Sequence, residues 1–184
     1  MKALKHIGLT EHRFDITPIV EELNAHGDLW NQFKGRLMHP QSPHRHTDDI
    51  WLRYAEENLH DKVRKVEGPH KSVWFPAAKE LPVTKALAER MFECVGAKEL
   101  GGVLLIRVPP GEQIYPHVDH GWHAKYYDKL AVQIESDIEQ EFAFEDGSLS
   151  ALPGESYWID NHYPHWVTNP TARPWINMTV CYRS

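Results

Sequence analysis

The sequence predicts a mainly β fold with additional helices, in which the second half of the chain forms an antiparallel jelly roll, or double-stranded β-helix. Two observations support this prediction. From Gly101 onward, short runs rich in β-branched and aromatic residues follow one another, separated by turns that contain Gly and Pro. In the first half, apolar residues recur instead at the spacing of amphipathic helices. We therefore expect a single domain, with a mostly helical support layer in residues 1–100 packed outside a β core in residues 101–184.

Two segments of the first half have the sequence pattern of helices. Residues 16–25 follow Asp15, a residue type that caps helices, and carry a short stripe of apolar side chains. Residues 81–94 have Pro82 in the first turn, where proline is favoured, and Gly96 just beyond the end. Both helices are expected to cover one face of the β core.

The clearest strand predictions fall in the second half, over residues 103–108, 129–135 and 175–181. Turn sequences punctuate this region at Pro109-Pro110-Gly111, Asp146-Gly147, Pro153-Gly154 and Asn169-Pro170. In the first half, residues 48–54 fit either a strand or the start of a helix, because their periodicity does not distinguish the two.

The composition limits the classes of partner. The chain has 184 residues, 41% of them hydrophobic, which is enough to bury a core. Its formal net charge of -6 at pH 7 argues against nucleic acid as the main partner, because such binding needs a basic face.

Cysteine content and hydropathy indicate a compartment. Cys94 and Cys181 lie far apart in the sequence and cannot form the disulfide framework of a small secreted domain. The first residues lead into no apolar signal-peptide core, and no run approaches the roughly 18 apolar residues of a membrane span. We therefore expect a cytoplasmic protein that has no membrane partner.

One pattern in the second half is typical of a metal site. In a facial triad, two imidazoles and one carboxylate occupy three adjacent positions of an octahedral metal such as Fe(II). His-x-Asp occurs three times, but only His117-Val118-Asp119 lies between strand-like runs, and His165 follows after a further β-like segment. Because residues i and i+2 of a strand point to the same side, His117 and Asp119 can both face a barrel mouth. The sequence therefore predicts His117, Asp119 and His165 as metal ligands.

Several motifs, in matching order and spacing, resemble one enzyme family. Residues 101–182 resemble the aspartyl/asparaginyl β-hydroxylase-like branch of the 2-oxoglutarate- and Fe(II)-dependent dioxygenases. The segments that carry the resemblance are residues 107–119, 152–160 and 165–169, followed by Arg173. The resemblance implies that the triad binds iron.

The resemblance also implies how the cosubstrate is held. An Arg shortly after the distal His pairs with the far carboxylate of 2-oxoglutarate in this family, which assigns that role to Arg173 and places it inside the barrel near the metal. Arg173 follows His165 at a slightly shorter spacing than is usual for the family. Its planar guanidinium can bind a carboxylate through two parallel hydrogen bonds. Lys129 is a second candidate for binding 2-oxoglutarate.

The implied reaction uses Fe(II) as cofactor, 2-oxoglutarate as cosubstrate and dioxygen as oxidant. The reaction hydroxylates a C–H bond of an amino-acid or peptidyl side chain, so that the product carries a hydroxyl group at that carbon. The metal and cosubstrate carry the oxidation, while the protein supplies placement and electrostatics. The substrate is thus expected to be a small molecule or a peptide.

Two other classes of function fit the same residues. A cupin-type metal enzyme that does not use 2-oxoglutarate would need the triad but not Arg173. A non-catalytic barrel that binds a small molecule would make the histidines incidental. His120, His123 and His162 could be alternative ligands, hydrogen-bond donors to the ligands, or exposed residues.

Further residues near these motifs have plainer interpretations. Trp122 and Tyr126-Tyr127 could line a substrate pocket, because they follow the first two predicted ligands closely. The cluster His44-Arg45-His46 is expected to lie in a solvated loop.

Overall fold

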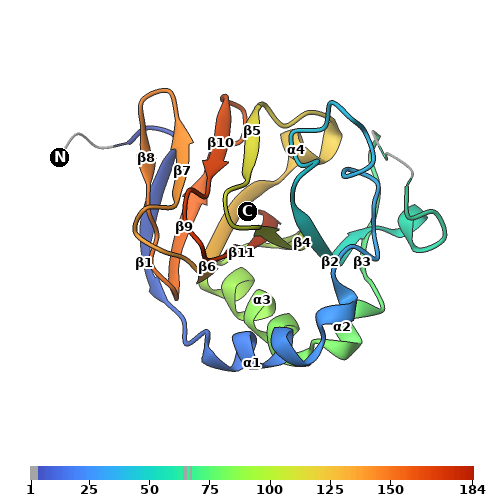
Figure 1. Ribbon diagram of the computed structural model, residues 1–184. Coiled ribbons are helices and arrows are strands. Elements are labelled where there is room, and N and C mark those ends of the chain that lie inside the picture. Colours follow the sequence, from blue (N-terminus) through green and yellow to red (C-terminus); the bar gives the residue numbers. More distant parts are fainter. Residues whose placement is uncertain (1–3, 64–65, 67) are drawn as a thin grey trace.

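The computed structural model describes residues 4–63, 66 and 68–184 (Figure 1). Its strands form two sheets, and every pairing between the described strands is antiparallel. The seven-stranded sheet runs in the order β1 (Ile7–Arg13), β9 (Glu155–Ile159), β6 (Asp128–Glu135), β11 (Trp175–Arg183), β4 (Glu99–Val108), β2 (Asp48–Ala55) and β3 (Ser72–Trp74). The four-stranded sheet runs in the order β5 (Gln113–His117), β10 (His165–Thr168), β7 (Glu141–Phe144) and β8 (Gly147–Leu149).

The two faces of the large sheet bury separate apolar clusters. Along β4, Val103 and Leu105 belong to the cluster that packs against the helices. Leu104 and Ile106 belong instead to the cluster that lies between the two sheets. Because side chains alternate across a strand, the apolar run of β4 serves both clusters at once. The predicted mainly β jelly roll, with helices outside it, is thereby confirmed.

The helices cover the outer face of the large sheet (Figure 1). The covering helices are α1 (Thr17–Ala25), α2 (Ala77–Glu80) and α3 (Pro82–Cys94). The short helix α4 (Trp122–Tyr126) lies elsewhere, after β5. The chain also has two 3-10 turns, η1 (Gly27–Leu29) and η2 (Glu56–Leu59). The predicted helices over residues 16–25 and 81–94 correspond to α1 and α3. Among the helices of the described chain, none is long and apolar enough to cross a membrane.

One carboxylate of α1 holds the start of α3. The Oε1 and Oε2 atoms of Glu22 accept the backbone N–H groups of Val83 and Thr84, each at 2.8 Å, and the Thr84 hydroxyl donates to Oε2 at 2.6 Å. Leu81, which precedes α3, makes no capping hydrogen bond through its side chain. Glu22 therefore satisfies N–H groups of the first turn that have no partner inside the helix.

Residues 1–100 contain strands of the large sheet as well as the expected helices. Within these residues β1, β2 and β3 are strands of the large sheet, β1 pairing with β9 and β2 with β4. The ambiguous segment 48–54 is therefore a strand. Because β1 lies at the sheet edge, only Ile7 of its residues is buried, and its polar sequence gives little apolar periodicity.

Candidate metal centre

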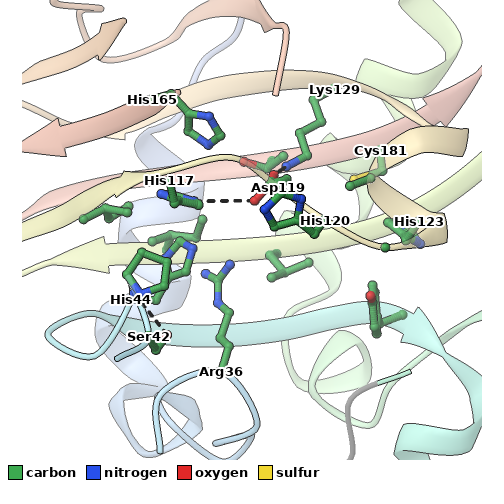
Figure 2. A pocket seen from close by; sticks show the side chains of 18 of the residues that line it. Arg36, Ser42, His44, His117, Asp119, His120, His123, Lys129, His165 and Cys181 are labelled. Atoms are coloured by element: carbon green, nitrogen blue, oxygen red, sulfur yellow. Dashed lines mark hydrogen bonds and ion pairs between the residues drawn. The ribbon is translucent and has the colours of Figure 1, made fainter. Parts of the chain in front are cut away.

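The structure brings His117, Asp119 and His165 together (Figure 2). His117 ends β5 and His165 begins β10, and the two residues are direct partners in the antiparallel pairing, with ring centroids 4.3 Å apart. Asp119 lies just beyond β5, where its backbone N–H donates to the carbonyl of Asn161 at 3.2 Å. One ligand atom from each triad residue lies within 4.8 Å of the others. Among the described residues, no other set of His, Cys, Asp or Glu side chains converges in this way.

Backbone carbonyls orient both imidazoles. The Nδ1 atom of His117 lies 2.7 Å from the Tyr115 carbonyl oxygen, and that of His165 lies 2.9 Å from the Tyr163 carbonyl oxygen. Because a carbonyl only accepts hydrogen bonds, each Nδ1 carries the proton, and each Nε2 keeps its lone pair. The Nε2 atom of His117 lies 3.4 Å from Oδ1 of Asp119.

Burial keeps the distal imidazole neutral. Desolvation lowers the pKa of His165 to about 4, with the charge of Asp119 opposing this shift and that of His117 adding to it. A neutral imidazole is the form that binds a metal, because protonation occupies the lone pair.

Asp119 is held as a carboxylate. Its Oδ2 atom pairs with the ammonium of Lys129 and accepts a hydrogen bond from Nδ2 of Asn161 at 3.3 Å. Burial alone would raise the pKa of Asp119, but the charge of Lys129 outweighs it and holds that pKa well below its usual value. Oδ2 is thus occupied by protein donors, whereas Oδ1 faces His117.

The triad opens into a cavity of about 800 Å³. One wall comes from alternate residues of β11, namely Trp175, Asn177, Thr179 and Cys181, as expected for the inward face of a strand. Lys129 of β6 also lines the cavity. The facing wall comes from the first half of the chain and includes Arg36, His44, Trp51 and Tyr54.

Arg173 lies elsewhere. It is exposed, it precedes β11, and it is not among the residues that line the cavity. Its backbone carbonyl accepts hydrogen bonds from Gln140 Nε2 at 2.9 Å and from Asn169 Nδ2 at 2.8 Å. The expectation that Arg173 lies inside the barrel near the metal is therefore wrong, because β11 begins only at Trp175, whose buried indole takes the first inward position.

Of the three additional histidines, only His120 and His123 line the cavity. Both ring nitrogens of His123 are engaged: Nε2 accepts the Gly102 N–H at 3.3 Å, and Nδ1 lies 3.0 Å from Nε2 of His70. His162 is exposed and pairs with Asp160 at 2.9 Å. His123 and His162 are thus committed to other partners.

Two interpretations of neighbouring residues also need correction. Trp122, Tyr126 and Tyr127 do not line the cavity. Trp122 instead stacks on Tyr126, with ring centroids 4.6 Å apart. His44 is not solvated but buried, with its ring edge-on to His117 at a centroid distance of 4.9 Å. No local sequence pattern indicated that His44 or Arg36 lines the cavity, because the contacts that bring them there join residues that are distant in the sequence.

The comparisons with known proteins find similarity in structure only. No protein-family model matches the chain, and no curated protein matches it either. An oxidoreductase of the 2OG-Fe(II) oxygenase family from Burkholderia pseudomallei is similar, with a TM-score of 0.54 and 9% identity, over 74% of this chain and 67% of that one. A collagen prolyl hydroxylase from Paramecium bursaria Chlorella virus-1, solved as a 2OG complex, gives a TM-score of 0.53 and 14% identity over 98% of this chain and 96% of that one. At these identities the likeness establishes a shared fold.

Proposed function

We propose that this protein is a 2-oxoglutarate- and Fe(II)-dependent dioxygenase that hydroxylates a C–H bond of an amino-acid or peptidyl side chain. The observation that carries the proposal is the convergence of His117, Asp119 and His165 at the mouth of a jelly roll. The shared fold with 2OG-Fe(II) oxygenases supports it.

The donor set fits Fe(II). Two neutral imidazoles and one carboxylate on one side of a metal leave open positions for small ligands, the arrangement of non-haem Fe(II) oxygenases. The residues that would hold the ion are His117, Asp119 and His165, while Lys129 and Asn161 fix the carboxylate from behind. When bound, the metal with cosubstrate and dioxygen would supply the oxidation of the C–H bond.

We assign the distal carboxylate of 2-oxoglutarate to Lys129. Its ammonium lies in the cavity beside the triad, on the inner strand β6, and its side chain is only 19% exposed. Among the described residues, its hydrogen-bond partner is Asp119, so donors remain for a further anion. Arg173 is exposed and does not line the cavity, so we do not assign this role to it.

The cavity suits a small molecule or a side chain of a peptide, because ligand sites commonly span about 300–1,000 Å³. Dioxygen is the remaining partner. Nucleic acid is not proposed as a partner, because the chain carries a net charge of -6 and such binding needs a basic face.

The experiment is reconstitution of the purified chain with Fe(II) under anaerobic conditions, followed by metal analysis and by titration with 2-oxoglutarate. We expect one Fe(II) per chain and slow conversion of 2-oxoglutarate to succinate after oxygen is admitted. Metal binding without 2-oxoglutarate binding or consumption would indicate a cupin-type enzyme instead. A chain that binds no metal would indicate a non-catalytic barrel.

A further inference from the structure

A second cation, Arg36, reaches the cavity from the segment between η1 and β2. Its Nε and Nη2 atoms donate to Oδ2 and Oδ1 of Asp49, at 2.5 and 2.8 Å. Asp49 belongs to β2 and is completely buried, whereas the side chain of Arg36 is 25% exposed. Figure 2 shows the guanidinium pointing from this segment toward the triad.

The pairing with Asp49 leaves one edge of the guanidinium open. A guanidinium has five N–H donors in a plane, and a carboxylate that takes the Nε and Nη2 edge leaves the edge formed by Nη1 and Nη2. Among the residues that the structure describes, Asp49 is the hydrogen-bond partner of Arg36. That open edge can therefore bind a second carboxylate through two parallel hydrogen bonds.

Among the described residues of the first half that line the cavity, Arg36 is the one Lys or Arg. Its neighbour His44 is buried, with its ring edge-on to that of His117. Lys129 belongs instead to β6 of the large sheet and pairs with Asp119. The two cations thus approach the triad from different elements, one from the barrel strands and one from the segment that covers the mouth.

A neighbouring pair shows what a purely structural arginine looks like in this fold. Asp48 precedes Asp49 on β2, so its side chain points to the other face. Arg107 of β4 pairs with Asp48 at 2.8 Å, and its guanidinium covers the ring of Trp30 at 4.3 Å. Arg107 does not line the cavity, whereas Arg36 does.

We propose that Arg36 binds a carboxylate of the substrate, so that the oxidised C–H bond belongs to a molecule or side chain that carries this anion nearby. The proposal rests on the proposed function, because it assigns the substrate of that same cavity. A monoanion fits better than a phosphate, since Arg36 and Asp49 together are neutral and Asp119 lies close by.

The test uses the full chain loaded with Zn(II), which is redox-inert, and saturated with 2-oxoglutarate. The probes are pairs that differ by one carboxylate: N-acetyl amino acids with their α-amides, and the N-acetyl α-amides of aspartate with asparagine and of glutamate with glutamine. Binding is measured by ligand-observed NMR. In the wild type we expect acids to bind and their matched amides to bind at least about tenfold more weakly. In Arg36→Met this acid preference should fall by about 10- to 100-fold.

Two further variants keep the result interpretable. Arg107→Met is the matched control and should bind the acids as the wild type does. Removing Arg36 leaves Asp49 buried without its partner, so Arg36→Met can unfold. Arg36→Lys keeps a cation for Asp49 but offers no second edge, and it should remain folded while losing most of the acid preference.

Equal binding of acids and amides to the wild type, or no binding of any acid, would overturn the proposal. So would an Arg36→Met protein in which affinity for 2-oxoglutarate falls and that for the acids does not, because Arg36 would then hold the cosubstrate. If the wild type binds no 2-oxoglutarate, the proposed function fails, and the same titration without cosubstrate still decides whether Arg36 binds carboxylates.

Discussion

His117 and His165 are partners across the antiparallel pairing of β5 and β10, and their ring centroids lie 4.3 Å apart. Two strands that are distant in the sequence thus place two imidazoles on the same side of one small sheet. The backbone carbonyl two residues before each histidine accepts a hydrogen bond from its Nδ1–H group, which leaves Nε2 available for a metal.

Replacing His165 with Ala should remove most of the metal affinity, because a facial triad that has lost one ligand holds the ion weakly. The loss in affinity for Fe(II) or Zn(II) should exceed the roughly 10- to 100-fold that removal of an outer-shell partner costs. Isothermal titration under anaerobic conditions measures it. His162→Ala is the control, since His162 is exposed and bonds to Asp160, and equal losses in both variants would contradict the assignment.

Lys129→Met should weaken the binding of 2-oxoglutarate by about 10- to 100-fold, because it removes a charged hydrogen-bond donor from the cavity. Arg173→Met should leave that affinity unchanged, since Arg173 is exposed outside the cavity. Titration of the Zn(II)-loaded variants with 2-oxoglutarate measures both. The reverse pattern, a loss with Arg173→Met alone, would show that the loop before β11 folds inward when the cosubstrate binds.

Acid should destabilise the protein through His123. Burial, and then the charge of His70, lower the pKa of His123 from 6.5 to about 3 in the folded chain. The unfolded chain therefore binds more protons between these values, so the stabilising contribution is present above pH 6.5 and is lost as the pH falls toward 3. Relative to His123→Gln, the wild type should lose up to about 1.4 kcal/mol of unfolding free energy per pH unit in this window.

Chemical denaturation at several pH values tests this slope. His60→Gln, a change at an exposed histidine, serves as the control for the loss of an imidazole. Parallel curves for the wild type and His123→Gln would contradict the prediction, because they would mean that His123 binds its proton equally well in the folded and unfolded chains.

Glu22→Ala should destabilise the fold by about 1–2 kcal/mol, since it removes the acceptor for N–H groups at the start of α3. Glu21→Ala changes the neighbouring, exposed residue of α1 and should cost little. The difference between the two unfolding free energies isolates the contact between α1 and α3. If it is near zero, water replaces Glu22 without loss.

The β core and the triad were predictable because their signals are local. Turn residues and apolar runs indicated β4, β6 and β11, and the His-x-Asp step together with His165 indicated three residues that the fold brings together. The helices α1 and α3 likewise follow from apolar periodicity and from proline in the first turn.

By itself, then, the sequence determined a mainly β fold, its outer helices and three residues that meet at one point. Only the tertiary structure decided that β1 and β2 join the large sheet, that Arg173 stays outside, and that Arg36 and His44 enter the cavity. The reason is physical: periodicity records which side of an element is buried, whereas the partner of a strand edge or the occupant of a cavity wall depends on contacts between distant residues. Such contacts leave no pattern along the chain.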